Sequence, residues 1–317
     1  MQILGEEAIG KSILDFEPDL IYSDTPLHAA NAKLFSFSVQ RSIPFIIHLI
    51  GDWWREYYSW FASAPWRKRL RSSEQYCYNW FSLLTSRKIA PICKWLERIV
   101  NHHLPWKATE VVYQGIDPSQ FDKTHETLKF ERPAVAIIQN HTIYPKVAGL
   151  MKFRSVIQNL PSVHFYITEG EMYDQRYVTL VRESMRNCKN VHFVKGINNP
   201  DAVRRMLNSV DCYVLATELD CCPTTILEAS LMRKPVLASR VGGVPEIVLE
   251  GQTGWTIPNE STSVWVEKIS ELAADRKLRE RLGATGRDWV SENFAWSKIA
   301  AQVEALMLDQ VYGDQLT

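Results

Sequence analysis

The sequence contains no apolar run of the roughly 20 residues that a membrane-spanning helix requires. Its first residues, MQILGEEAIGKS, include neither the basic n-region nor the apolar h-region of a secretory signal peptide. Excess charge is also lacking, because 36 Lys and Arg residues balance 36 Asp and Glu residues, so the basic field typical of nucleic-acid binders is missing. The six cysteines follow none of the spacings of zinc ligands or redox pairs. These absences predict a cytoplasmic protein with structural thiols, no metal site and no nucleic-acid partner.

The length and the patterning of the chain predict its fold class. At 317 residues, the chain has room for about two domains of roughly 150 residues each. Strand-like apolar runs alternate with helix-like segments along the whole sequence, which is typical of α/β folds with parallel sheets. We therefore predict two doubly wound, Rossmann-like lobes with a cleft between them, where ligands are expected.

The first lobe is expected over residues 1–120, with strands at 18–24, 43–50, 81–86 and 109–115. Lobes of this kind normally begin with a strand, whereas this chain begins with a helix-like segment. We therefore expect the first lobe to lack its initial strand or strands.

The second lobe is expected after a polar linker at 121–133 and spans residues 134–297. A last helical segment, 298–317, is expected to pack back on the first lobe. Strands of the second lobe are expected at 134–140, 163–170, 191–196, 211–217, 235–239 and 254–257.

The most informative segment is 210–258, where a strand run leads through a loop into a helix that starts near Pro223 and Thr224. Backbone N–H groups and the positive end of the helix dipole make such a start suitable for a phosphate. Glu228 lies about one turn inside this apolar helix, and a buried carboxylate needs partners such as sugar hydroxyls. Asp220, eight residues earlier, is expected to face the same ligand.

These residues resemble, in order and spacing, the donor-binding half of the retaining GT-B glycosyltransferases of family 4. The resemblance covers nearly the whole chain, including 18–54 and 111–121, and is strongest over 190–258. The shared pattern consists of Asp220-x7-Glu228, Ala229-Ser230, PVLAS at 235–239, Gly242-Gly243-Val244-Pro245-Glu246 and Gly251-Gln252-Thr253-Gly254.

The resemblance implies that a sugar moves from a nucleotide-diphosphate sugar to an acceptor hydroxyl, with retention at the anomeric carbon. The acceptor would be a glycan, a polysaccharide or a lipid-linked molecule, as in cell-envelope polysaccharide biosynthesis. Neither a metal nor a cofactor is expected, because helix amides and a lysine would neutralise the diphosphate.

The resemblance also implies roles for individual residues. Glu228 would hold the ribose hydroxyls, and Asp220, Lys146 and His48 would act as catalytic residues at the sugar and the diphosphate. His48 and Asp52 are expected at the cleft end of a first-lobe strand. The other residues expected to line the donor are Cys222, Pro223, Thr224, Thr225, Gly196, Gly242, Gly243, Asn140 and His141.

Two departures from the family pattern affect this interpretation. The first acidic position is usually glutamate, whereas this chain has Asp220. The arginine that usually precedes the lysine is absent, and Asn140 and His141 stand there. The alternative for the whole chain is therefore a non-catalytic nucleotide-sugar-binding module or an inactive transferase, and a GT-B epimerase or phosphorylase is a third interpretation.

Single residues also have ordinary structural interpretations. Asp220 could form an Asx turn, and Lys146 could be a solvated lysine. Glu228 could lie on a helix surface, Gly242-Gly243 could be a plain turn, and His48 could be a satisfied core histidine.

Aromatic and basic residues are concentrated in segment 53–107, which holds seven of the eleven tryptophans. Residues 66–107 carry nine basic and two acidic side chains. This combination suits contact with an anionic membrane surface. The alternative is ordinary core tryptophans beneath solvated helix charges.

Overall fold

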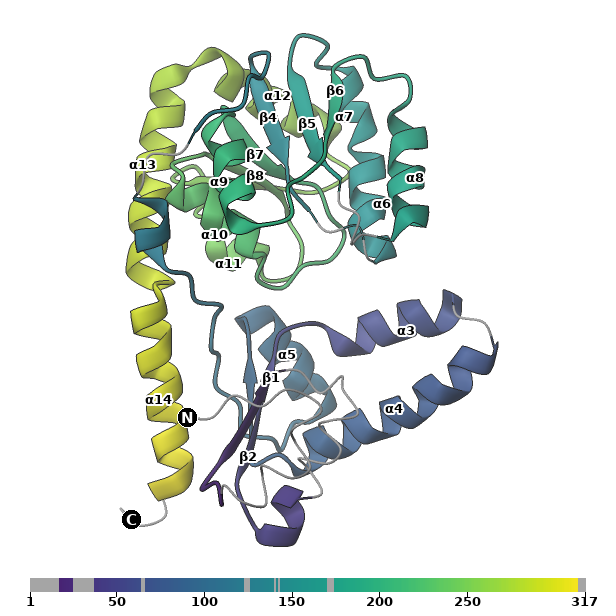
Figure 1. Ribbon diagram of the computed structural model, residues 1–317, viewed down its shortest axis with the longest axis vertical. Coiled ribbons are helices and arrows are strands. Elements are labelled where there is room, and N and C mark those ends of the chain that lie inside the picture. The colour runs from purple at the N-terminus through teal and green to yellow at the C-terminus, as the bar shows by residue number, and fades with distance from the viewer. Residues whose placement is uncertain are drawn as a thin grey trace. The chain divides into compact units, whose positions relative to one another are not determined.

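The computed structural model describes residues 17–24, 37–63, 66–122, 126–139, 141, 143–169 and 174–312 (Figure 1). It divides into two compact units, of which unit 1 comprises Met1–Tyr113 and Ile299–Thr317 and unit 2 comprises Gln114–Lys298. Both units are built on parallel sheets, so the prediction of an α/β fold with parallel sheets is confirmed.

Unit 1 contains a three-stranded sheet in the order β1-β2-β3. Its strands are β1 (Ile21–Asp24), β2 (Phe45–Leu49) and β3 (Lys88–Pro91). The central strand β2 buries residues that point to both faces, including Phe45 and Ile46. Such continuous burial explains why this strand is an unbroken apolar run in the sequence.

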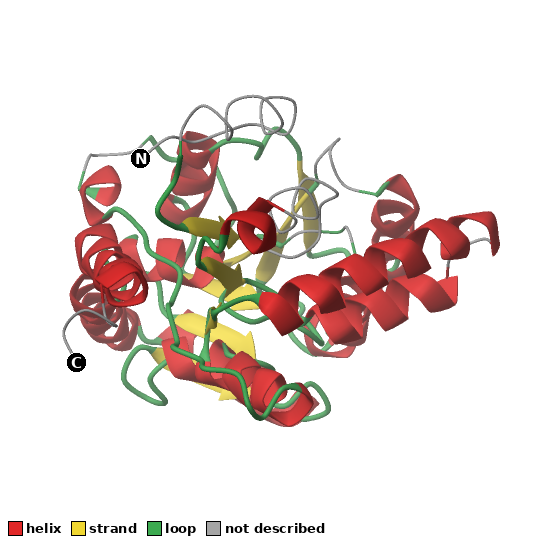
Figure 2. Ribbon diagram, turned by 90° about the horizontal axis from the view of Figure 1, so that it is seen from below, coloured by secondary structure: helices red, strands yellow, loops and turns green. Residues whose placement is uncertain are grey.

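The helices α3 (Trp53–Ser63) and α4 (Trp66–Thr85) run side by side as a helical hairpin in unit 1 (Figures 1 and 2). Aromatic rings join them, because Tyr76 of α4 stacks on Trp53 of α3 at 5.0 Å between ring centroids. Residues 81–86, predicted as a strand, instead form the end of α4 and the residue after it. The prediction was wrong because the apolar run FSLLTS belongs to a helix with one buried face, on which Leu83 lies, while Phe81 is exposed.

The extended segment 109–115 was predicted as a strand, but it forms only one isolated bridge, between Thr109 and Ile89 of β3. Its backbone stays beside β3, since the Val112 amide donates to the Pro91 carbonyl at 3.0 Å. Unit 1 also contains α5 (Lys94–His103), a helical stretch over 37–41 and, from Ile299 onward, α14 (Trp296–Tyr312). Helix α14 packs on this unit through Ile299 and Leu306, which share a buried cluster with Ile46 and Val112.

Unit 2 contains a six-stranded parallel sheet in the order β6-β5-β4-β7-β8-β9. This is the doubly wound order, whose direction reverses between β4 and β7. The strands are β4 (Ala134–Ile137), β5 (His164–Thr168), β6 (Val191–Val194), β7 (Cys212–Leu215), β8 (Val236–Ser239) and β9 (Gly254–Ile257).

Helices cover both faces of this sheet (Figure 1). One face forms the main core of the unit, in which alternate strand residues such as Val135 and Ile137 meet Val147, Phe153 and Trp265 from the helices. The helices that contribute to this core are α6 (Tyr144–Lys152), α7 (Arg154–Gln158), α8 (Gln175–Met185), α12 (Thr262–Ala274) and α13 (Arg276–Asn293). The remaining helical elements are η1 (Pro118–Phe121), α9 (Pro200–Asn208), α10 (Thr224–Leu231) and α11 (Val244–Ile247).

The segment that the sequence predicts as a linker is attached to unit 2. Within it, the Leu128 amide donates to the Ser209 hydroxyl at 2.6 Å, and Arg132 pairs with Asp211 at 2.5 Å. The division of the structure therefore falls at Tyr113/Gln114, earlier than the predicted boundary at 120, because side chains of unit 2 anchor the polar segment.

The tryptophans of segment 53–107 do not form one exposed surface. Trp53 and Trp54 are 1% and 3% exposed, whereas Trp106 is 69% exposed. The side chains of Trp60, Trp66, Arg67, Lys68, Arg69, Arg71 and Glu74 lie outside the described residues. In the described part of the chain, no helix combines the length and the apolar character needed to cross a membrane.

Candidate functional site

The carboxyl edge of the unit 2 sheet brings together most of the predicted site residues. Because all six strands are parallel, the loops after β4, β7 and β8 leave the sheet at this one edge. The first loop leads to Lys146, the second contains Asp220, and the third contains Gly242. Ligands of doubly wound sheets bind at this edge, beside the position where the strand order reverses.

Lys146 and Asp220 form an ion pair across two of these loops. The Lys146 Nζ atom lies 2.9 Å from Asp220 Oδ2, and the side chains are 24% and 13% exposed. The other carboxylate oxygen, Asp220 Oδ1, accepts a hydrogen bond from the Cys221 amide at 3.0 Å. The Asx-type contact and the ion pair are therefore compatible, since each uses a different oxygen.

A close backbone approach at Gly149 and a hydrogen bond at Pro145 hold the first two turns of α6 against the loop after β7. A Cβ atom on Gly149 would lie 2.4 Å from the Thr217 Cα atom, so only glycine fits there. The Glu218 amide also donates to the Pro145 carbonyl at 3.0 Å. These contacts fix the backbones that carry Lys146 and Asp220.

The Gly242-Gly243 turn packs directly on Asp220. Gly242 has φ +54°, and a Cβ atom there would lie 1.9 Å from the Asp220 carbonyl oxygen. The Gly243 amide faces the same oxygen and donates to it at 3.3 Å. The glycine pair therefore positions the Asp220 loop, which a plain turn would not require.

Replacing Gly242 by alanine tests this close packing. We expect the free energy of unfolding to fall by about 2–4 kcal/mol, because the left-handed backbone is strained and the new Cβ displaces Asp220. Chemical denaturation measures the change. The matched control is Gly251→Ala, whose φ is +70° but whose Cβ meets no heavy atom within 4 Å, so it carries only the cost of backbone strain. Equal losses in the two variants would contradict the role of the Asp220 contact.

The amino end of α10 lies next to Asp220 in the chain. Pro223 is the N-cap residue, and among the described residues no side chain caps this helix end. Thr224 is exposed, whereas the Thr225 hydroxyl is 2.7 Å from the hydroxyl of buried Tyr213. The helix start therefore offers backbone N–H groups from its first turn to an anion, and the diphosphate contact expected of Cys222 to Thr225 stays a prediction.

Glu228 lies one turn into α10, where burial raises the pKa of its carboxyl to about 7. The charge of Arg204 in α9 opposes this increase. Arg204 is itself buried, pairs with Asp201 at 2.6 Å and lies over the Phe121 ring. A carboxylate that burial disfavours gains from new hydroxyl donors, so Glu228 is well suited to hold sugar hydroxyls.

His141 stands where the resembled family has an arginine, and it is fully buried. Burial lowers its pKa to about 4, although the nearby Glu169 carboxylate acts in the opposite direction. His141 is therefore neutral at pH 7 and supplies no positive charge to the site. Asn140 lies outside the described residues.

Two predicted residues lie outside the loops after β4, β7 and β8. Gly196 is exposed in the loop after β6, with φ +77° and no heavy atom within 4 Å of a Cβ placed on it. His48 belongs to unit 1, where its Nε2 atom lies 2.9 Å from the Val112 carbonyl oxygen. This hydrogen bond favours the interpretation of His48 as a satisfied core histidine.

Sequence reasoning missed several residues whose hydrogen bonds hold the loops and the helix of the site in place. The Tyr213 hydroxyl lies 2.9 Å from the Ile138 carbonyl oxygen and 2.7 Å from the Thr225 hydroxyl, within hydrogen-bond distance of both. Asn259 donates to the Thr217 carbonyl at 2.9 Å and accepts from Ser239 at 2.5 Å. A tyrosine within β7 was a weak signal in the sequence, but nothing in the sequence connects Arg204 with Glu228.

Unit 1 carries a separate cavity of about 600 Å³. Asp52 lies in its wall and is 4% exposed, and burial raises the pKa of its carboxyl. The ring of Trp54 stacks on His103 at 4.6 Å, and burial lowers the pKa of that histidine. The full lining consists of Asp52, Trp54, Arg55, Tyr58, Trp95, Arg98, Ile99, His102 and His103.

Residues 152–289 of this chain match the family model described as glycosyl transferases group 1. This range includes Asp220, Glu228 and Gly242, and it begins just after Lys146.

Curated relatives match parts of the chain. The N-acetyl-alpha-D-glucosaminyl L-malate synthase of Bacillus anthracis is 26% identical over 221 residues, which cover 67% of this chain and 56% of the relative. A GDP-mannose-dependent alpha-(1-6)-phosphatidylinositol monomannoside mannosyltransferase of Mycolicibacterium smegmatis is 35% identical over 81 residues, covering 26% of this chain and 21% of the relative. The chain thus spans at most 56% of the length of these two relatives.

Solved glycosyltransferase structures share the fold. Sucrose-phosphate synthase from Thermosynechococcus elongatus has a TM-score of 0.77 at 17% identity, covering 98% of this chain and 77% of that one. Anabaena HepE in complex with UDP has a TM-score of 0.72 at 16% identity, covering 95% of this chain and 82% of that one. The chain therefore has the α/β fold of GT-B glycosyltransferases.

Proposed function

We propose that this protein is a retaining glycosyltransferase, similar to those of family 4, which moves a sugar from a nucleotide-diphosphate sugar to an acceptor hydroxyl. The observation that carries the proposal is the Lys146–Asp220 pair at 2.9 Å, held by Gly242 at the carboxyl edge of the sheet. The match of residues 152–289 to glycosyl transferases group 1 supports the same activity.

In this proposal, the donor lies along the edge formed by α6 and α10. Lys146 and the first-turn amides of α10 neutralise the diphosphate, so the reaction needs neither a metal ion nor a cofactor. Asp220 contacts the hydroxyls of the transferred sugar, and Glu228 accepts hydrogen bonds from the ribose hydroxyls. The exposed Gly196, with no heavy atom within 4 Å of a Cβ placed on it, leaves space for the rest of the nucleotide.

The proposed reaction needs no protein nucleophile. The acceptor oxygen forms its bond to the anomeric carbon on the face from which the diphosphate leaves, which retains the configuration. The departing phosphate oxygen takes the proton of the acceptor hydroxyl. Protein groups contribute by stabilising the negative charge that develops on the leaving diphosphate.

The unit 1 cavity is our candidate for acceptor binding. Aromatic rings such as Trp54 and Tyr58 suit the apolar faces of a sugar, and Arg55 and Arg98 suit an anionic group. This lining favours a glycan or lipid-linked acceptor that carries a phosphate or carboxylate. His48 is not needed for this role, because its Nε2 atom is already within hydrogen-bond distance of Val112.

A second candidate function is a non-catalytic nucleotide-sugar-binding module. The observation that favours it is the neutrality of His141, which leaves the diphosphate with one cation fewer than the resembled family supplies. Release of free nucleoside diphosphate from a bound donor distinguishes the two, because a binding module produces none.

Thermal unfolding of the purified chain with a panel of donors tests the proposal. The panel contains UDP-glucose, UDP-N-acetylglucosamine, GDP-mannose and ADP-glucose. We expect one nucleotide class to raise the melting temperature, since a ligand at one hundred times its Kd adds about 2.7 kcal/mol to the folded state.

The matching sugar without its nucleotide serves as the control for this experiment and should leave the melting temperature unchanged. A protein that unfolds cooperatively and is stabilised by no member of the panel would contradict both the transferase and the binding module.

A further inference from the structure

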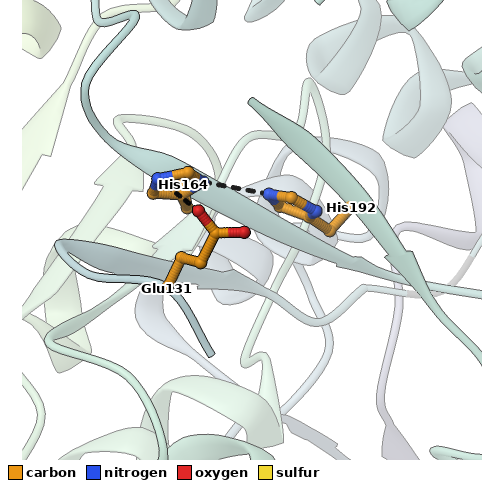
Figure 3. Close-up of side chains that lie close together, drawn as sticks. All are labelled: Glu131, His164 and His192. Atoms are coloured by element: carbon orange, nitrogen blue, oxygen red, sulfur yellow. Dashed lines mark hydrogen bonds and ion pairs between the residues drawn. The ribbon is translucent and has the colours of Figure 1, made fainter. Parts of the chain in front are cut away.

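A cluster of two histidines and a glutamate lies on the unit 2 sheet, away from the proposed donor site (Figure 3). Its members are His164 of β5, His192 of β6 and Glu131, which precedes β4. One ligand atom from each lies within 4.8 Å of the other two, and in the described part of the chain no other three His, Cys, Asp or Glu residues converge in this way.

The sheet itself brings the two histidines together. In the parallel register, Tyr166 of β5 pairs with His192 of β6, so His164 and His192 point to the same face. The His164 Nδ1 atom is 3.0 Å from His192 Nε2, and His164 Nε2 is 3.6 Å from Glu131 Oε2 (Figure 3).

Neighbouring rings and a backbone hydrogen bond hold the ligands in place. His192 stacks on Tyr166 at 4.7 Å between centroids, and Phe130 stacks on the same tyrosine at 3.8 Å. The Glu131 amide donates to the Tyr166 hydroxyl at 2.7 Å, which places the glutamate beside the histidines. Such support reduces the ordering that a ligand set must undergo when it binds an ion.

We propose that His164, His192 and Glu131 bind a divalent transition-metal ion of the zinc type. Imidazole nitrogens with a single carboxylate suit zinc, whereas magnesium and calcium prefer sets of oxygens. Two nitrogens bound to one tetrahedral zinc ion are about 3.3 Å apart, close to the 3.0 Å between the histidines. Water completes the coordination, because Glu131 is 72% exposed and leaves the site open to solvent.

Binding requires only small movements of the side chains. The Nδ1 atom of His164 lies near His192 and its Nε2 atom lies near Glu131, and an ion would bind one of these two nitrogens. When His164 Nδ1 and His192 Nε2 both face the ion, the proton between them moves to the other nitrogen of the ring that carried it, so both histidines bind as neutral imidazoles. The exposed Glu131 turns its carboxylate to the third position.

The location of the site indicates a structural role. His164 is the first residue of β5, so the cluster lies toward the amino edge of the sheet, whereas Lys146 and Asp220 follow its carboxyl edge. At about 3.3 Å per residue, the five residues of β5 separate the two sites by roughly 15 Å. The ion would fasten the segment before β4 to β5 and β6.

Zinc titration of the full chain, prepared without a histidine tag and freed of metal by chelation, tests this proposal. We expect one zinc ion to bind with an increase in melting temperature. Cobalt should give the visible absorption bands of a tetrahedral site. The His164→Gln and His192→Gln variants should each lose at least about tenfold in zinc affinity. Glu131→Gln, a change at an exposed side chain that leaves the core untouched, should also weaken binding.

The matched control is His102→Gln, which removes an exposed histidine from unit 1 and should leave zinc affinity unchanged. Zinc binding that is equally strong in the Glu131, His164 and His192 variants would overturn the proposal. The same holds if a folded parent chain binds no zinc, because the histidines would then form only a hydrogen-bonded pair.

Discussion

We expect the Glu228→Gln variant to lose nucleotide-sugar binding while becoming harder to unfold at pH 8. The loss of binding follows because ribose hydroxyls donate hydrogen bonds, and a charge-assisted bond to a carboxylate is about twice as strong as one to a neutral amide. Glutamine keeps the size of the side chain, so a change in packing does not explain the effect. Glu228→Ala should abolish binding as well.

The gain in stability follows from the direction of the pKa change. Burial raises the pKa of the Glu228 carboxyl from 4.5 to about 7. Between these values the folded chain holds a proton that the unfolded chain has released, so stability falls as the pH rises through this range. Above pH 7 the folded chain bears the full free-energy cost of an ionised, buried carboxyl. Glutamine removes this cost and should stabilise the chain by about 1–3 kcal/mol.

Urea unfolding at pH 8 and at pH 4.5 measures this difference. The advantage of the glutamine variant should disappear at pH 4.5, where Glu228 is protonated in the folded chain. The matched control is Glu183→Gln, an exposed acid on α8 that should change neither stability nor donor binding. A Glu228→Gln variant that binds donor like the parent would remove Glu228 from the proposed site.

The sequence predicted unit 2 more accurately than unit 1, for a physical reason. Strands that are buried on both faces are short apolar runs bounded by polar loops, and β4, β7 and β8 of unit 2 are such strands. Unit 1 contains the α3–α4 hairpin, in which aromatic residues such as Tyr76 and Phe81 lie on a helix. Aromatic residues also favour strands, so the end of α4 was taken for one.

The residues of the candidate site also differ in how far the sequence could predict them. Asp220 and Glu228 could be located from their spacing, because β7, its loop and α10 determine where they lie, and Gly242 could be located in the same way from the loop after β8. Arg204 and Tyr213 could not, since the charge of Arg204 near Glu228 and the hydrogen bond of Tyr213 to Thr225 depend on how α9 and α10 pack beside β7. The sequence could place His141 at the site but could not predict its charge, because its neutrality comes from complete burial.

Replacing Lys146 by alanine should produce the largest loss of activity. Its Nζ atom lies 2.9 Å from Asp220, at the place where the diphosphate is proposed to leave. Since His141 is neutral, no charge from that neighbour replaces the lysine. Removing one such electrostatic group typically lowers turnover by about 10²–10³-fold. Donor hydrolysis, measured as release of nucleoside diphosphate, gives the rate, and titration calorimetry gives the donor Kd.

The ion pair makes a further expectation possible. Without Lys146, the Asp220 carboxylate is left with an uncompensated charge that repels the diphosphate. Adding Asp220→Asn to the alanine variant should therefore recover part of the donor affinity but none of the turnover, since the lost cation is not restored.

Lys152→Ala is the matched control for Lys146, because Lys152 lies in the same helix and pairs with Glu218 at 2.5 Å, but it is 56% exposed. An exposed pair contributes little, so this variant should keep its turnover and its donor affinity. If both lysine variants lost turnover equally, the effect would belong to α6 as a whole rather than to the cation beside Asp220. If neither did, charge neutralisation of the diphosphate would have to come from the amides of α10 alone.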